Sequence, residues 1–292
     1  MNFFGYLDQS DLDFLESSIQ PRSNHTFILS HYPSGTLIKG TSSKGSSFPY
    51  VTRNVSVWFS GHLHKLIGGL GNTMYSNEAN RYLELELGDM KSNAMFRVVA
   101  VDHDVISFID LPVQVPEPSK TLDSALFEHR PPVILITYPK DGRFLITHRE
   151  GKTKLDHSRY IRFLAWSSSD KMDFVVRIDG IQQPNLKPKY SGRGKSWKTG
   201  VPVNASEYIP LWTIAWDPSK YKDGKVHILT VEGTQSNGKS GSHTIHFRHD
   251  GELIPEMDAG SGGFIISVRF DAFVSLECFT HRINTGSSKA CS

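Results

Sequence analysis

The chain has 292 residues, of which 38% are hydrophobic and 21% charged, and its 32 basic and 30 acidic residues give a formal net charge of +2. This length suffices for two domains with real cores, and the composition excludes a chain that is disordered throughout. Cys278 and Cys291 are the only cysteines, which excludes a disulfide scaffold and a cysteine-ligated zinc site. The sequence also predicts no signal peptide at its start and contains no apolar run long enough to cross a bilayer.

A helix and a strand are predicted near the start of the chain. Asp8 can cap a helix that carries Leu12 and Leu15 on one face. Residues 26–29 are apolar and predict a short buried strand. This strand ends just before His31, so the polar side chain of His31 is a candidate site residue.

Two further strands are predicted downstream. Residues 55–59 form an apolar run that predicts a second buried strand, which ends close to His62 and His64. Residues 35–48, between the two buried strands, are rich in Ser, Gly, Thr and Lys and predict a mobile surface loop. Residues 82–87 alternate leucine with Tyr or Glu, as a strand with two distinct faces does.

A β-hairpin is predicted next, with residues 95–101 and 105–111 as its strands and residues 102–104 as its tight turn. We place the end of the first domain at residue 111, so that this domain comprises residues 1–111. The composition then shifts, because several prolines surround a polar stretch in residues 112–132. This segment is therefore predicted to be a linker.

Residues 133–250 predict an antiparallel β-sandwich. Short apolar runs recur there with turn signals such as Asp179-Gly180 and Asp223-Gly224 between them. The predicted strands are residues 133–137, 143–147, 160–166, 174–178, 211–216, 225–231 and 242–247. Residues 251–292 have no periodic face and remain an unassigned tail.

His31, His62 and His64 form the strongest candidate site. In extended backbone, residues two apart point to the same side, so His62 and His64 can both reach one pocket. Imidazoles are common ligands of divalent transition metals, and two ions about 3.5–4 Å apart can clamp a phosphoryl group. The alternative is that these are ordinary surface or core histidines, because a His-x-His pair also arises by chance.

The segments that carry these histidines resemble the last two metal motifs of the calcineurin-like metallophosphoesterases, namely Ser30-His31 after a strand and Ser60-Gly61-His62-Leu63-His64. Other segments, including residues 83–89, are similar to a membrane-anchored member in which an immunoglobulin-like domain and then membrane spans follow the phosphoesterase domain. The resemblance implies an α+β, mostly β chain. Residues 1–111 would be the C-terminal part of a phosphoesterase domain whose N-terminal half is missing, and residues 133–250 an immunoglobulin-like antiparallel β-sandwich.

The resemblance also implies a division of the ligands. His31 and His62 would ligate one metal ion and His64 a second, with ions of the Mn, Fe or Zn class. The reaction would be metal-assisted hydrolysis of a phosphoester whose identity the sequence leaves open. The remaining family ligands lie in Asp-x-His, Gly-Asp-x-x-Asp and Gly-Asn-His-Asp motifs, none of which precedes His31. Asp89 follows the His-x-His motif and does not substitute for them.

We therefore expect the chain by itself to be incomplete and inactive, as a truncated product or a natural short isoform. The alternative is a non-catalytic interaction protein, whose immunoglobulin-like domain binds a protein partner beside a vestigial phosphoesterase region. Membrane association is implied only through segments that this sequence does not contain, and the compartment stays open.

Several other sequence features are not interpreted as functional sites. Asn24, Asn54 and Asn204 begin glycosylation sequons, which matter only if the chain enters the secretory pathway. A run of basic and aromatic residues at 187–198 predicts a solvated loop, and the balanced charge predicts no nucleic-acid partner. His103 is expected to be a solvated turn residue.

His243 and His246 are also predicted to have no role as a shared metal site. They lie on one predicted strand but three residues apart, so they point to opposite faces. We interpret both as ordinary strand histidines.

Overall fold

The computed structural model describes residues 4–19, 23–64, 74–76, 82–91, 94–113, 130–150, 158–169, 171–192 and 209–255. The chain divides into two compact units, residues 93–255 and the remainder. Each unit is described by itself.

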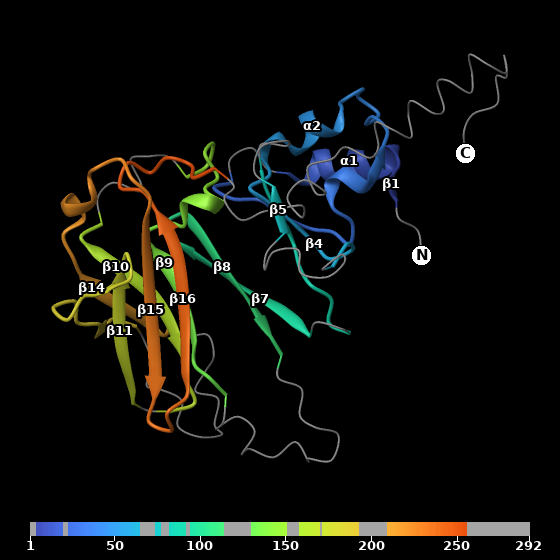
Figure 1. Ribbon diagram of the computed structural model, residues 1–292. Coiled ribbons are helices and arrows are strands. Elements are labelled where there is room, and N and C mark those ends of the chain that lie inside the picture. Colours follow the sequence, from blue (N-terminus) through green and yellow to red (C-terminus); the bar gives the residue numbers. More distant parts are fainter. Residues whose placement is uncertain are drawn as a thin grey trace, which may run out of the picture. The chain divides into compact units, whose positions relative to one another are not determined.

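The described residues of the first unit form a short mixed sheet, a separate strand pair and two helices (Figure 1). Its elements are β1 (Gly5–Leu7), α1 (Gln9–Ser18), β2 (Phe27–Leu29), the 3₁₀ turn η1 (Ser34–Thr36), β3 (Leu37–Lys39), α2 (Phe48–Val51), η2 (Thr52–Asn54), β4 (Val57–Ser60), β5 (Met74–Ser76) and β6 (Leu83–Glu86). The sheet order is β2-β4-β6-β5, in which β2, β4 and β6 run parallel and β5 is antiparallel to β6. Because parallel strands run in one direction, the carboxyl ends of β2, β4 and β6 lie at the same edge of the sheet.

Helix α1 begins as the sequence predicts. The Asp8 carboxylate accepts the Asp11 N–H at 2.9 Å, and the Asp8 N–H donates to the Asp11 carboxylate at 3.1 Å. This reciprocal pair satisfies backbone donors that the first helical turn leaves free. Leu12 on the apolar face is fully buried. It joins a core of Ile19, Leu37, Phe48, Val51, Val55, Trp58 and Tyr82.

Strand β2 forms where it is predicted, but the expectation that it is buried is wrong. Phe27 is 38% exposed and Leu29 83% exposed. Among the described residues β2 pairs only with β4 and so forms one edge of the sheet. The neighbouring β4 is buried as predicted, because it lies between β2 and β6.

The mobile surface loop expected at residues 35–48 is wrong for residues 35–39 and for Phe48, which begins α2, whereas most of residues 40–47 are an exposed loop with a turn. Gly35 and Thr36 are buried in η1, and Leu37 in β3 is 3% exposed. Strand β3 pairs in parallel with β1, in register Gly5↔Leu37. The distant partner β1 gives a polar segment its structure, and no local pattern reveals such a partner.

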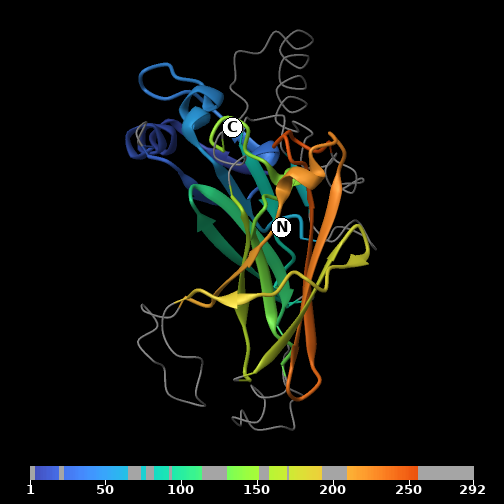
Figure 2. The ribbon, with the colours of Figure 1, turned by 90° about the vertical axis from the view of Figure 1, so that its left-hand side faces the viewer.

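The second unit is built around two four-stranded antiparallel sheets (Figures 1 and 2). Its strands are β7 (Met95–Asp102), β8 (Val105–Pro112), β9 (Val133–Tyr138), β10 (Tyr160–Trp166), β11 (Met172–Ile178), β12 (Ile181–Gln182), β13 (Lys189–Tyr190), β14 (Leu211–Ala215), β15 (His227–Gln235) and β16 (Ser240–Phe247), with the 3₁₀ turns η3 (Gly142–Phe144) and η4 (Pro218–Tyr221). One sheet has the order β13-β14-β10-β9 and the other β12-β11-β15-β16. The predicted sandwich is confirmed in this arrangement.

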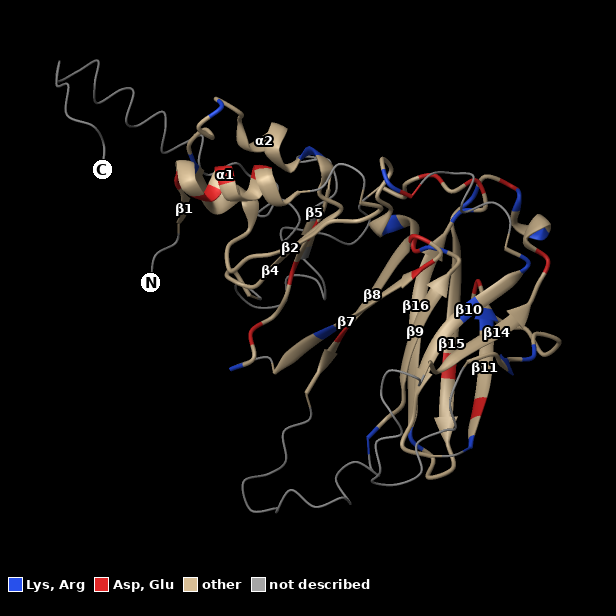
Figure 3. Ribbon diagram, turned by 180° about the vertical axis from the view of Figure 1, so that it is seen from behind, with Lys and Arg blue, Asp and Glu red and all other residues tan. Residues whose placement is uncertain are grey.

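Side chains from both sheets form one core between the two layers. The buried members are Ile134, Ile136, Ile161, Phe163, Ala165, Val176, Ile178, Ile214, Leu229, Val231, Ile245 and Phe247. Trp212 and Trp216 pack against this cluster. On the strands themselves, acidic and basic positions are interspersed (Figure 3), and Arg177 on β11 pairs with Glu232 on β15 at 2.8 Å.

One predicted strand of the sandwich is wrong. Residues 143–147 contain η3 followed by a turn. The Asp141 carboxylate accepts the Arg143 N–H at 3.1 Å and starts the 3₁₀ turn. The buried Glu150 carboxylate accepts the Ile146 N–H at 2.9 Å. These side-chain acceptors take backbone donors that a strand would offer to a neighbouring strand.

The predicted hairpin is confirmed as β7 and β8, and His103 and Asp104 in its turn both have positive φ. It belongs to the second compact unit, which begins at residue 93, whereas the sequence places the end of the first domain at residue 111. The reason is packing: the Asp102 carboxylate accepts hydrogen bonds from Thr137 and Arg162, both at 2.7 Å.

A buried ion pair also fastens this hairpin. Lys140 donates to the Ile106 carbonyl and to the Glu150 carboxylate, the latter at 3.1 Å, and Glu150 accepts the Ile106 N–H at 2.6 Å. Both charged residues are at most 6% exposed. Residues 114–129 of the predicted linker and 256–292 of the unassigned tail lie outside the described residues.

Candidate metal centre

Two of the candidate histidines follow neighbouring parallel strands. His31 comes two residues after β2, and His62 comes two residues after β4. The strands pair in register Leu29↔Phe59, and beyond their ends the Gly61 N–H donates to the His31 carbonyl at 3.2 Å. The backbones of the two histidine segments are therefore held together at the carboxyl edge of the sheet, where ligands of open parallel sheets commonly bind.

The imidazoles of His31 and His62 face each other. His31 Nε2 and His62 Nδ1 are 3.1 Å apart, and the rings meet edge to face with centroids 4.9 Å apart. Tyr32 packs on the His62 ring at 4.4 Å. His62 is 7% exposed, whereas His31 is exposed, so the pair connects the interior of the unit with its surface.

This geometry suits a shared metal ion. Two nitrogens that bind one ion at about 2.1 Å, at an angle of about 90° to 110°, lie about 3.0–3.4 Å apart. The observed separation of 3.1 Å falls in this range. It also suits a hydrogen bond between a protonated and an unprotonated ring nitrogen, so the two arrangements must be separated by experiment.

His64 is placed differently from the prediction. Residues 61–64 form a bend rather than extended backbone, and His64 has a φ of 55°. Its Nδ1 lies 3.4 Å from Oδ2 of Asp89. The structure thus pairs His31 with His62 and places His64 beside a carboxylate. Metal binding by any of the three histidines stays a prediction.

Two buried glutamates on β6 hold the segments that carry these histidines. Glu86 accepts the N–H groups of Leu63 at 2.5 Å and His64 at 3.0 Å, and it also accepts the Ser60 hydroxyl. Glu84 accepts the N–H and the hydroxyl of Ser34 at 2.6 and 2.7 Å. Both glutamates are at most 2% exposed.

Burial changes the protonation of both carboxyls. It raises the pKa of Glu84 to about 7, although the Ser34 hydrogen bonds act in the opposite direction. Burial likewise raises the pKa of Glu86, against hydrogen bonds from Ser60, His64 and Leu63. Sequence reasoning places these residues on one face of a strand and misses their role. Their burial could have been predicted if the strand had been recognised as parallel, because parallel strands are usually covered on both faces.

Within the described residues, no group of three or more His, Cys, Asp and Glu side chains is arranged to hold a metal ion. The centre as described therefore offers a pair of imidazoles and a separate His–carboxylate contact. This donor set fits part of a divalent-metal site.

The other predicted histidines have structural roles. His103 lies in the exposed β7–β8 turn, 2.6 Å from Asp102. His243 accepts the Ile136 N–H at 2.9 Å, and burial lowers its pKa to about 4. Of the sequon asparagines, Asn24 is exposed and Asn54 half-buried, while Asn204 lies outside the described residues.

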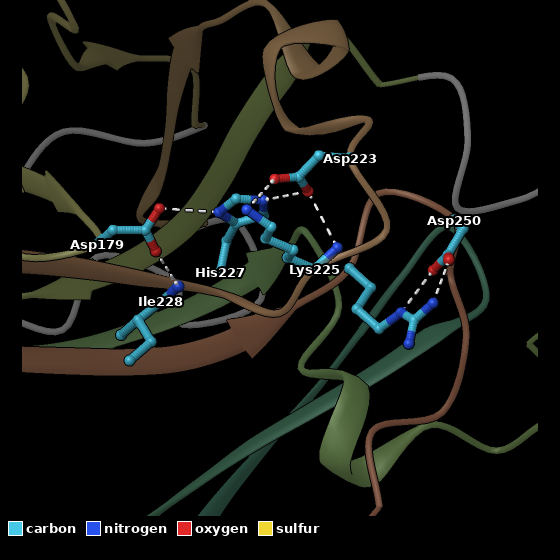
Figure 4. A network of polar contacts seen from close by, with 7 residues as sticks. Asp179, Asp223, Lys225, His227, Ile228 and Asp250 are labelled. Carbon is cyan, nitrogen blue, oxygen red and sulfur yellow. Dashed lines mark hydrogen bonds and ion pairs between the residues drawn. The ribbon is translucent and has the colours of Figure 1, made fainter.

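A further histidine site, which sequence reasoning missed, lies in the second unit (Figure 4). His227 Nδ1 is 2.8 Å from Asp179, and its Nε2 is 3.0 Å from Asp223. Burial by itself lowers the pKa of His227, but the hydrogen bonds with the two carboxylates outweigh burial and raise it. The carboxylates bind opposite nitrogens of the ring, so this arrangement is an ion-pair clamp and does not point all three groups at one ion.

Comparison with known proteins finds one matching family model and two similar proteins. Residues 128–253 match the family model of the TMEM62 Ig-like domain, and this range encloses the predicted sandwich. Transmembrane protein 62 of Mus musculus is 31% identical over 257 residues, which cover 86% of this chain and 34% of that protein. The chain is a homologue of transmembrane protein 62.

A second, more distant relative carries a phosphoesterase name. A protein of Arabidopsis thaliana, named as a candidate metallophosphoesterase, is 23% identical over 220 residues, or 61% of this chain and 28% of that protein. The chain thus spans about a third of the length of these relatives or less. In the part of the chain that the structure describes, no helix is long and apolar enough to cross a membrane.

Proposed function

We propose that the first unit is the histidine-bearing part of a calcineurin-like metallophosphoesterase domain and contributes imidazole ligands to a divalent-metal site. The observation that carries this proposal is the 3.1 Å contact between His31 Nε2 and His62 Nδ1 at the ends of adjacent parallel strands. The metallophosphoesterase name of the plant relative supports the same reaction class.

The three histidines divide into two sets of ligands. In a complete site, His31 and His62 would bind one ion, and His64 would bind a second through Nε2, because its Nδ1 faces Asp89. Imidazole ligands suit Zn and Fe, and Mn is suitable where carboxylates join them, so the ions belong to the Mn, Fe or Zn class. The substrate is a phosphoester, and a bound divalent ion would act on its phosphoryl oxygens as a Lewis acid.

The chain's own residues orient the candidate ligands. Tyr32 contacts the buried His62 ring with the two ring centroids 4.4 Å apart, and the Glu86 carboxylate accepts the backbone N–H of His64. Two divalent ions held close together require anionic ligands, and these histidines supply none. We therefore expect the 292 residues by themselves to bind at most about one ion and to hydrolyse no phosphodiester above background.

The test is a titration of the purified chain with Zn²⁺, Mn²⁺ or Co²⁺ by calorimetry. We expect binding that is lost in His31→Ala and His62→Ala and unchanged in His103→Ala, whose ring lies in the exposed turn of the second unit. A chain that binds no ion, or that binds equally well without His62, would overturn the proposal. Phosphodiester turnover that both His62→Ala and His64→Ala abolish would instead show that the site is complete.

A further inference from the structure

One short acidic segment contacts the chain close to every candidate ligand. Glu84 and Glu86 lie on β6, and Asp89 follows that strand. Glu84 holds Ser34, three residues after His31, while Glu86 holds the backbone of Leu63 and His64. Asp89 contacts the His64 ring.

Glu86 supplies hydrogen-bond acceptors to backbone N–H groups that have none within a helix or strand. Residues 61–64 form neither helix nor strand, yet Leu63 is only 3% exposed. Buried N–H groups without acceptors cost free energy comparable to a lost hydrogen bond. Oε1 of Glu86 accepts the N–H groups of Leu63 and His64, and Oε2 accepts the Ser60 hydroxyl. The carboxylate thus fixes the bend that separates His62 from His64.

The contact of Asp89 determines which ring nitrogen of His64 carries the proton. A carboxylate 3.4 Å from Nδ1 favours the tautomer that carries its proton there. Nε2 then keeps the lone pair that a metal ion needs. Carboxylate partners of this kind orient metal-binding histidines, and their loss costs about 10-fold to 100-fold in metal affinity.

We propose that Glu86 and Asp89 are positioning residues of the histidine centre: Glu86 sets the backbone bend between His62 and His64, and Asp89 sets the tautomer and orientation of the His64 ring. This inference rests on the proposed function. It adds two residues that touch no ion and that act only through the ligands.

The first test compares substitutions at Glu86 by Co²⁺ titration, with the visible absorption spectrum as the readout. In Glu86→Met the side chain keeps its length but accepts no hydrogen bond, so we expect about 10-fold to 100-fold weaker binding and a changed spectrum. Glu86→Gln keeps an oxygen for the two N–H groups, and its NH₂ can donate to Ser60, so it should bind nearly as the wild type does. Glu16→Met is the matched control, because it removes a glutamate that holds Ser46 in the same unit at 2.9 Å.

The second test is independent of metal. In the metal-free chain, NMR should show slow amide exchange at Leu63 and His64 in the wild type and in Glu86→Gln, and at least about 10-fold faster exchange in Glu86→Met. The ¹⁵N shifts of the His64 ring should show a proton on Nδ1 in the wild type. In Asp89→Leu this population should move to Nε2, while Asp89→Asn, whose amide oxygen still accepts, should resemble the wild type.

The outcomes separate this inference from the proposed function. If the wild type binds Co²⁺ and Glu86→Met binds it equally, with the same spectrum, the inference is wrong and the proposed function stands. If neither the wild type nor any variant binds Co²⁺, the proposed function is wrong. The inference is then tested by the NMR measurements alone. Unchanged amide exchange in Glu86→Met together with an unchanged tautomer in Asp89→Leu would overturn it.

Discussion

At the scale of single residues, the histidines and the glutamates of the first unit differ in how far sequence reveals them. His31, His62 and His64 stand out in the sequence because they lie shortly after apolar runs, which is a local pattern, and their metal binding stays a prediction. Glu84 and Glu86 do not, because alternation with leucine is typical of a strand with one solvated face. In the structure all four residues of β6 are buried, since β4 and β5 flank this strand and the segments around Ser34 and Leu63 meet its glutamates.

The first prediction concerns the protonation of Glu84. Burial raises its pKa to about 7 in the folded chain from the ordinary value of 4.5, so the folded state binds a proton more tightly than the unfolded state. The resulting stability is fully present below pH 4.5 and is lost as the pH rises through about 7. The raised pKa corresponds to about 3 kcal/mol of free energy of unfolding at most.

Glu84→Gln provides the comparison, because glutamine does not titrate. We expect the free energy of unfolding of the wild type, minus that of Glu84→Gln, to fall between pH 5 and pH 8 by up to about 3 kcal/mol. Urea unfolding followed by the Trp58 indole resonance, whose N–H donates to Tyr32 at 3.0 Å, measures this in the first unit. A difference that does not change with pH would contradict the raised pKa.

At the scale of elements, some predictions failed because a distant partner decides the structure, and the strand predicted at residues 143–147 failed because the nearby side chains of Asp141 and Glu150 take its backbone donors. The limits of β10 are those predicted, because its apolar run pairs on both sides with β9 and β14. Strand β3 was missed because only its pairing with β1 orders it. The exposure of β2 depends on how many neighbours a strand has, and its own residues do not encode that number.

The second prediction concerns the clamp that fixes the start of β15. Protonated His227 can donate to Asp179 and Asp223 at once, whereas the neutral ring donates to only one of them. The pKa of His227 is raised from 6.5, so its stabilisation is present below pH 6.5 and is lost as the pH rises through the folded-state value. NMR titration should give a pKa above 6.5 for His227, and Asp179→Asn should lower it. A pKa at or below the ordinary value would contradict the clamp.

The third prediction concerns the buried ion pair that fastens β8. Lys140→Met leaves Glu150 charged and buried, so we expect the free energy of unfolding of the second unit to fall by about 3–5 kcal/mol. Lys225→Met is the matched control, because Lys225 is 78% exposed and its amine lies 3.9 Å from Asp223. This control should change stability by less than about 1 kcal/mol in urea unfolding. Equal effects of the two substitutions would show that the Lys140 pair does not stabilise the unit.

At the scale of the whole molecule, the chain divides into two compact units with separate cores, whereas the sequence places the end of the first domain at residue 111. The proline-rich segment after residue 111 suggested a linker, yet the compact units divide at residue 93. The hairpin β7–β8 joins the second unit through buried polar contacts such as those of Asp102, and residue composition does not reveal such contacts.

The central claim is that the first unit of this homologue of transmembrane protein 62 contains a metal centre built on His31 and His62. The most direct measurement is X-ray absorption fine structure at the zinc edge of the chain loaded with Zn²⁺. We expect nitrogen ligands at about 2.0–2.1 Å with the outer-shell scattering of two imidazoles, lost in the double variant His31→Ala, His62→Ala. A spectrum with oxygen ligands alone, or one that the double variant leaves unchanged, would contradict the account.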